Sequence, residues 1–194
     1  MEVLDCLLKK YSYAQFKTHL ETTCPDAIGF TAFTFEFPSA LKMAELVKAG
    51  NPKIKVVIGG PQASAVPLEV MKYPPVDFVV LTEGEDTFAR LVDALAAGDL
   101  SFGGINNFAY RQGAEVKVNP VLLSDDFEAL PYSDFKAIDL PKYPKLYLAK
   151  EHPSAPIITS RGCPFSCRFC SGPKLSGKKF RSRSAANISA EIKH

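Results

Sequence analysis

The sequence is 194 residues long, the size of one ordinary domain or two small ones, and 46% of its residues are hydrophobic, enough for a core. Charged residues make up 23% and the net charge is +2, which excludes wholesale disorder and gives no reason to expect nucleic acid or an acidic membrane as the main partner. No apolar run reaches the roughly 18 residues of a spanning helix, and Met1–Asp5 lacks the features of a signal peptide, so we expect a cytoplasmic protein.

Short β-like runs alternate with helical patterns along the first 118 residues. Three apolar, β-branched runs predict strands at residues 27–33, 54–58 and 77–81. Helices are predicted at residues 39–50, 65–73 and 88–98, and glycines end the first and the last. This alternation predicts a parallel sheet with helices on both faces. The turn at Gln112-Gly113 predicts a hairpin between residues 108–110 and 116–118.

The composition changes after Asn119. Six prolines between positions 120 and 156 interrupt every regular pattern, and residues 119–154 are interpreted as a linker that wraps around the protein. Pro156–Ser160 then predicts a new strand, and Ser184–Lys193 predicts a helix. We therefore divide the chain into a first domain at 1–118, a linker at 119–154 and the start of a second domain at 155–194.

Three of the five cysteines lie within eight residues, at Cys163, Cys167 and Cys170. In a cytosolic chain such clustering indicates metal binding rather than a disulfide framework. Thiolates on one short loop can bind neighbouring irons of a [4Fe–4S] cluster, and three cysteines leave the fourth iron open for a small-molecule ligand. The alternative is a structural zinc held with His152 or His194, although the second cysteine pair typical of zinc sites is missing.

The segment Thr159–Ser171, which reads TSRGCPFSCRFCS, resembles the signature of radical S-adenosylmethionine (radical SAM) enzymes. The resemblance implies that Cys163, Cys167 and Cys170 hold a [4Fe–4S] cluster whose open iron binds the amino and carboxylate groups of SAM. It implies that Phe169 lies near the adenine. It also implies a small-molecule substrate, attacked by a 5′-deoxyadenosyl radical, and an electron donor such as flavodoxin or ferredoxin.

The first domain resembles the cobalamin-binding domain that precedes the radical SAM domain in one large subgroup. The matching segments are residues 25–31, 56–63, 76–80 and 83–88. In the family a hydroxyl residue ends one strand and a double glycine ends the next, so a planar macrocycle can lie against the backbone. By itself the double glycine fits a plain tight turn equally well. The resemblance implies cobalamin contacts from Thr31, Gly59, Gly60, Pro61, Gln62 and Glu83.

The sequence also departs from the family. It lacks the Asp-x-His-x-x-Gly loop whose histidine ligates cobalt in methionine synthase-type proteins. Val3-Leu4-Asp5 resembles the second strand of the flavodoxin-like order 2-1-3-4-5, and the central first strand has no counterpart. About 35 residues follow the predicted cysteine strand, whereas a full barrel takes roughly 250. The expected fold is therefore a Rossmann-like (flavodoxin-like) α/β domain followed by the first βα unit of a partial TIM-type barrel, and we expect the chain alone to be inactive.

The leading interpretation is a cobalamin-type radical SAM enzyme that performs radical methylation or a related reaction on a small molecule. Three alternatives remain open: a cobalamin-binding module without catalysis, a radical SAM protein whose Rossmann-like domain binds no corrin, and a zinc-stabilised interaction protein. Glu85 fits the charge preference of a helix N-terminus. A basic stretch is interpreted as a solvated loop rather than a nucleic-acid patch. Its members are Lys174, Lys178, Lys179, Arg181 and Arg183.

Overall fold

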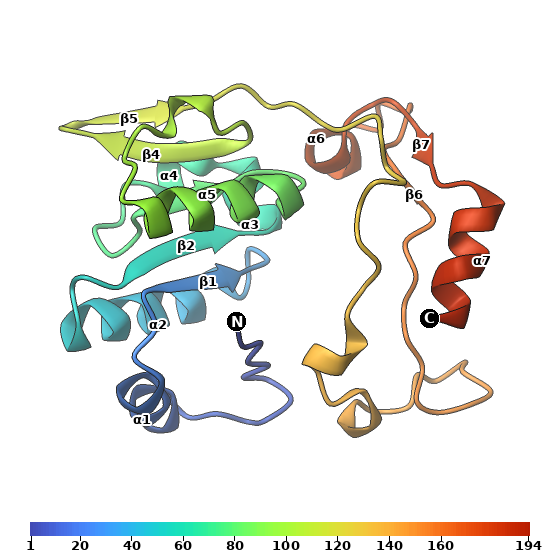
Figure 1. Cartoon of the computed structure of the whole chain (residues 1–194), viewed down its shortest axis with the longest axis horizontal. Coiled ribbons are helices and arrows are strands. Elements are labelled where there is room, and N and C mark those ends of the chain that lie inside the picture. The colour runs from blue at the N-terminus through green and yellow to red at the C-terminus, as the bar shows by residue number, and fades with distance from the viewer.

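The computed structural model describes all 194 residues and contains seven α-helices and seven strands (Figure 1). None of the helices combines the length and hydrophobicity required to cross a bilayer. The elements follow one another as α1 (Tyr13–Thr23), β1 (Ala27–Thr31), α2 (Phe37–Gly50), β2 (Lys55–Gly59), α3 (Pro61–Ala65), α4 (Pro67–Val70), β3 (Phe78–Val80), α5 (Glu85–Ala97), β4 (Phe108–Gln112), β5 (Glu115–Val118), β6 (Ser160–Arg161), α6 (Gly172–Ser176), β7 (Arg181–Ser182) and α7 (Ala185–Lys193).

Five strands form one sheet in the order β1-β2-β3-β4-β5. The first three are parallel and joined by helices, which confirms the predicted Rossmann-like α/β core. The predicted hairpin is also confirmed, with Gly113 at φ +64 in its turn. Because β4 pairs antiparallel with β3, the hairpin extends the same sheet, which is therefore mixed rather than purely parallel.

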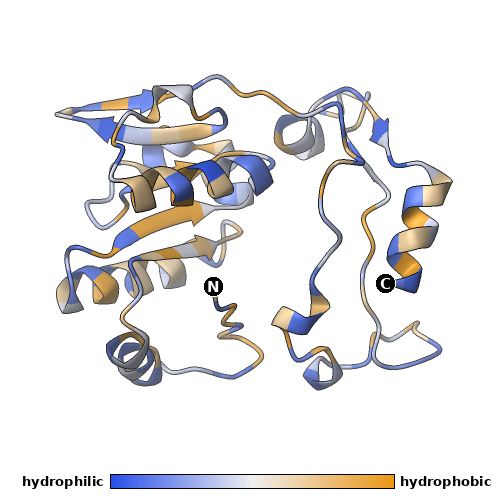
Figure 2. Ribbon diagram, in the orientation of Figure 1, coloured by the Kyte–Doolittle hydropathy of each residue, from blue (hydrophilic) through white to orange (hydrophobic).

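Helices cover both faces of this sheet, as predicted. Alternate residues of β2 point to opposite faces, so Val56 and Ile58 join the core under α1 to α4, whereas Val57 joins a second core under α5. The second core is rich in aromatic rings, and Phe78 lies edge-on to Phe102 and stacked on Phe108. The hydrophobic colouring of β2 in Figure 2 reflects this burial on two sides.

Three local predictions are wrong. The helix expected at residues 65–73 is replaced by α3 and α4, because Pro67 lacks an N–H and begins a new helix. Residues 3–5 form no strand, and Leu4 packs against the core beside α1 and α2. The strand expected at 156–160 shrinks to the two residues of β6, since only these find a partner strand.

Residues 119–159 contain no strand or α-helix, only two 3₁₀ turns. They lead from the hairpin to the second part of the molecule, which Figure 1 shows beside the carboxyl ends of β1 and β2. There β6 and β7 form a two-residue antiparallel ladder, and α6 packs near α3. The expected βα unit therefore differs in form: β6 is followed by the cysteine loop and short α6, and the longer α7 comes after β7.

Candidate functional site

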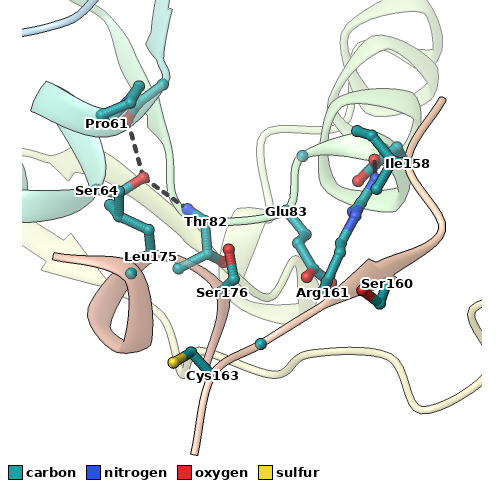
Figure 3. A pocket seen from close by; sticks show the side chains of 15 residues that line it. Pro61, Ser64, Thr82, Glu83, Ile158, Ser160, Arg161, Cys163, Leu175 and Ser176 are labelled. Carbon is teal, nitrogen blue, oxygen red and sulfur yellow. Dashed lines mark hydrogen bonds and ion pairs between the residues drawn. The ribbon is translucent and has the colours of Figure 1, made fainter. Parts of the chain in front are cut away.

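A cavity of about 600 Å³ lies where the carboxyl ends of β2 and β3 meet the cysteine loop (Figure 3). Fifteen residues line it, and only three of them are hydrophobic. Ligand sites in α/β sheets occur at this edge because the strands end there and their loops diverge. Four of the predicted site residues come together in the lining, from opposite ends of the chain: Gly60, Pro61, Glu83 and Cys163.

The double glycine forms a tight turn at the edge of this cavity. Gly60 has φ +86, and a Cβ there would lie 2.6 Å from Thr31 Oγ1 and 3.0 Å from the amide nitrogen of Ala32. A glycine is therefore required at position 60 by the close approach of two strand ends. At Gly59 the nearest atom to a Cβ would be 3.8 Å away, so the fold itself does not require that glycine.

Thr31, Gly59 and Gln62 lie beside the cavity but do not line it. The side-chain oxygen of Gln62 accepts a hydrogen bond of 2.7 Å from the hydroxyl of Thr34, which ties α3 to the loop after β1. Thr31 is exposed, and its hydroxyl faces Gly60. Their contacts with a cofactor stay predictions.

Ser64 and Thr82 belong to the site, although the sequence did not single them out. The hydroxyl of Ser64 donates to the carbonyl of Gly60 at 2.9 Å and accepts from the amide of Thr82 at 2.8 Å (Figure 3). Thr82 has φ +54, which is rare for a β-branched residue, and its buried hydroxyl has no hydrogen-bond partner. Strained backbone and an unpaired buried polar atom both cost free energy, and both are typical of ligand sites.

Two carboxylates pair with two arginines at the cavity, where Glu83, Glu85 and Arg161 belong to the lining. We call Glu83, Glu85, Arg161 and Arg181 the carboxylate–arginine cluster. Arg181 binds both oxygens of Glu83, at 2.8 and 2.5 Å, and Arg161 binds Glu85 at 2.5 Å. The hydrogen bonds that Arg181 donates to Glu83 raise the pKa of Arg181. Burial raises the pKa of Glu85, but the hydrogen bond from Arg161 and its own amide together outweigh burial and leave the pKa below its ordinary value.

This cluster changes the interpretation of three residues. Glu83 lines the cavity, but its carboxylate is held by arginines, and a cofactor contact from it stays a prediction. Glu85 does begin α5, and it also pairs with Arg161. Arg181 is buried, so the interpretation of the whole basic stretch as a solvated loop is wrong at this position.

The cysteine loop runs from β6 to α6 and is shaped by two glycines. Gly162 has φ +89, and a Cβ there would overlap the carbonyl group of Lys179. Gly177 has φ +78, and its carbonyl accepts a hydrogen bond of 3.0 Å from the amide of Cys163. These conformations fold the two ends of the loop against each other.

The three thiols have the exposure and donors that a cluster needs. Cys163 is half-buried at the cavity, and Cys167 and Cys170 are exposed on the same loop. The sulfur of Cys170 accepts a 3.3 Å hydrogen bond from the amide of Gly172. No three His, Cys, Asp or Glu side chains surround one point, as a single metal ion requires. A [4Fe–4S] cluster takes one thiolate at each of several irons, so three cysteines on one loop are the donor type that it uses.

The alternative zinc ligands lie elsewhere. The ring of His152 contacts the carbonyl oxygen of Pro141 at 3.0 Å, and the ring of His194 lies 5.8 Å from that of Tyr132. Phe169, predicted to lie near the adenine of SAM, is 95% exposed, so its ring is free to contact a ligand.

Known proteins resemble this chain in sequence and in fold. The B12 binding domain family matches residues 2–92. An uncharacterized methyltransferase of Pyrococcus horikoshii is 31% identical over 194 residues, which cover 99% of this chain and 41% of that protein. An anaerobic magnesium-protoporphyrin IX monomethyl ester cyclase of Rubrivivax gelatinosus is 28% identical over 194 residues, covering 97% of this chain and 34% of that protein.

Among solved structures, the cobalamin-dependent S-adenosylmethionine radical enzyme OxsB, with aqua-cobalamin and S-adenosylmethionine bound, shares the fold with a TM-score of 0.74 at 21% identity. The match covers 94% of this chain and 25% of OxsB. The chain thus spans less than half the length of each of these proteins. Residues 2–92 thus match the B12 binding domain family, and the cavity lies at the carboxyl edge of the sheet that this region forms.

Proposed function

We propose that the chain, whose residues 2–92 match the B12 binding domain family, is part of a cobalamin-dependent radical SAM enzyme. In this proposal cobalamin lies at the carboxyl edge of the sheet, and Cys163, Cys167 and Cys170 hold a [4Fe–4S] cluster that binds SAM. The observation that carries the proposal is the single cavity shared by Gly60 of the B12 binding domain and Cys163 of the cysteine loop.

The residues of this chain have separate tasks in that scheme. When bound, the cluster and SAM supply a 5′-deoxyadenosyl radical, and cobalamin supplies a carrier for a methyl group. The thiolates hold the iron, Gly162 and Gly177 fold the loop that presents them, and Phe169 offers a ring to the adenine. Thr82 lines the cavity, and its buried hydroxyl has no partner within the chain.

The reaction class we propose is radical methylation, or a related change, of a small-molecule substrate. Relatives named as methyltransferases support methylation, and the relative named as a cyclase supports the broader class. A reductant such as flavodoxin or ferredoxin would supply the electron. The main rival, a cobalamin-binding module without catalysis, is supported by the B12 binding domain match, which ends before the cysteine loop.

The test is anaerobic reconstitution of the full chain with iron and sulfide, followed by iron quantification and low-temperature EPR with and without SAM. We expect about four irons per chain and a cubane signal. Cys167→Ala should lose the iron, whereas Cys24→Ala, a matched change at another exposed cysteine, should retain it. Hydroxocobalamin is then titrated and followed by absorbance.

The outcomes separate the rival functions. Zinc bound in place of iron would overturn the radical SAM proposal. Corrin bound by a chain that forms no cubane would favour the cobalamin module. A cubane in a chain that binds no corrin would favour a radical SAM protein with a docking domain.

A further inference from the structure

The base of the cysteine loop brings two positive charges together. In the β6–β7 ladder Arg161 pairs directly with Arg181, and Ser160 pairs with Ser182. Like charges directly opposite each other destabilise a strand pair, and a ladder this short has no stability of its own. The ladder therefore needs compensation from outside itself.

The second part of the chain has almost no core that could provide it. Of the 28 buried residues, all but two belong to residues 1–118, and the exceptions are Phe127 and Arg181. Both exceptions touch the carboxylate–arginine cluster: Arg181 is a member, and the guanidinium of Arg161 lies 4.8 Å from the ring centroid of Phe127. The burial around the loop base is thus centred on charged groups.

The compensating charge comes from the B12 binding domain. Glu83 lies at the end of β3, with its side chain 13% exposed, and it is bound by Arg181, whose side chain is 4% exposed. Glu83 also lies 3.8 Å from Arg161, so one carboxylate faces both arginines. Arg181 further donates to the carbonyls of Ser124, in the linker, and Ser176, at the end of α6.

Other charges nearby are engaged elsewhere. Lys179 pairs with Asp125 at 2.7 Å, and both side chains are largely exposed. Arg183 pairs with Glu191 of α7. Glu85 lies beside Arg161, but its side chain is 40% exposed, so solvent screens that pair more than the Glu83–Arg181 pair.

We propose that Glu83 is a positioning residue for the cysteine loop: its charge neutralises the facing arginines and so closes the loop base against the carboxyl edge of the sheet. The chain path makes the effect direct, because Arg161 precedes Cys163 by two residues and the amide of Cys163 bonds to Gly177 only when the loop is closed. The inference rests on the proposed function only in assigning a cluster to this loop.

The test compares two variants with opposite defects in the full chain. Glu83→Gln keeps the size and hydrogen-bonding oxygen of the side chain but removes its charge, and Glu83→Asp keeps the charge but shortens the reach. Hydrogen exchange is followed at the amides of Cys163 and Arg183, which bond to Gly177 and Thr159 across the loop base. We expect Glu83→Gln to accelerate exchange at least tenfold and Glu83→Asp to accelerate it less.

Controls separate this effect from general loosening. Asp125→Asn removes an exposed ion pair in the same region and should leave both amides within twofold of the wild type. Amides of β2 should be unchanged in every variant. In an Arg181→Met background, where no charge faces Arg161 across the ladder, Glu83→Gln should accelerate exchange less than threefold.

The same variants are then reconstituted with iron and sulfide. Glu83→Gln should broaden or shift the EPR signal of the reduced cluster at matched iron content, and Glu83→Asp should shift it less. The proposal is overturned if Glu83→Gln leaves the loop amides protected, if Glu83→Asp is the more damaging change, or if sheet amides exchange faster as well. A wild-type chain that assembles no cluster would refute the proposed function, while the exchange results would still decide the role of Glu83.

Discussion

Replacing Gly60 by alanine tests the geometry of the double glycine most sharply. Gly60 has φ +86 and ψ −171, a region that alanine occupies only under strain of about 1–3 kcal/mol. Its Cβ would lie 2.6 Å from Thr31 Oγ1, which can rotate away, but also 3.0 Å from the backbone nitrogen of Ala32, which cannot. Together these effects predict a loss of about 2–4 kcal/mol of unfolding free energy. For a chain of this size that is a fall in melting temperature of roughly 5–15 °C.

The matched control is the neighbouring glycine. A Cβ at Gly59 would make ordinary contacts, 3.8 Å from the carbonyl oxygen of Val80, and its backbone needs no positive φ. Gly59→Ala should therefore leave stability unchanged or raise it by about 0.4–1 kcal/mol, because alanine restricts the unfolded chain. Melting curves by circular dichroism of the two variants and the wild type give the comparison directly.

Two results would refute the reasoning. If Gly60→Ala is as stable as the wild type, the turn tolerates a side chain. If both variants lose the same unfolding free energy, the Cβ contacts at positions 59 and 60 do not determine stability. Adding Thr31→Ala to Gly60→Ala should recover only part of the loss, since the contact with the Ala32 backbone remains. If Gly59→Ala melts normally but binds hydroxocobalamin more weakly, Gly59 serves the macrocycle rather than the fold.

Three further predictions concern other parts of the site. Thr82→Val removes the unpaired hydroxyl at constant shape, so it should be neutral or stabilising without ligand and should weaken hydroxocobalamin binding about 3–10-fold by absorbance titration. Gly162→Ala should lower the iron bound after reconstitution while the circular dichroism melt of the sheet stays unchanged, because its Cβ overlaps Lys179 and not the sheet. Glu85→Gln should lower the melting temperature at pH 7 by at most about 4 °C, since the pair with Arg161 is partly exposed. The folded-state pKa of Glu85 lies below its ordinary value, so this stabilisation is present above about pH 4.3 and is lost as the pH falls through the lowered pKa. The melting temperatures of Glu85→Gln and the wild type should therefore converge in acid, once the pH is below the lowered pKa. A difference in melting temperature that persists there would contradict the charge-based explanation.

The sheet was predictable because its signals are local. The runs at 54–58 and 77–81 are apolar over their whole length, as strands covered on both faces must be, and Gly50 and Gly98 mark where helices end. The run at 156–160 has the same β-branched character but forms a strand only at its last residue, because β7 is too short to pair with the rest. Strand propensity is thus expressed only where a partner is available.

The site was predictable in its parts and not in its assembly. The spacing of Cys163, Cys167 and Cys170 predicts a cluster site, and the adjacent glycines at 59 and 60 predict a tight turn. The pairing of Glu83 with Arg181 joins residues 98 positions apart, and it depends on the register of a two-residue ladder. Thr82 gives no local signal either, because only the finished cavity shows that its hydroxyl lacks a partner.

The uneven distribution of the core explains why such a site depends on charged contacts. One wall of the cavity is the edge of a sheet that residues 1–118 stabilise with nearly all of the buried apolar surface. The other wall, the cysteine loop, has no apolar core of its own, and in the proposed function this exposure leaves its thiols open to a cluster and its ligands. Its position then depends on contacts that can be strong within a small area, and a bidentate arginine–carboxylate pair is the strongest that side chains offer. This is why Arg181 is buried and Glu83 faces away from water at the boundary between the two walls.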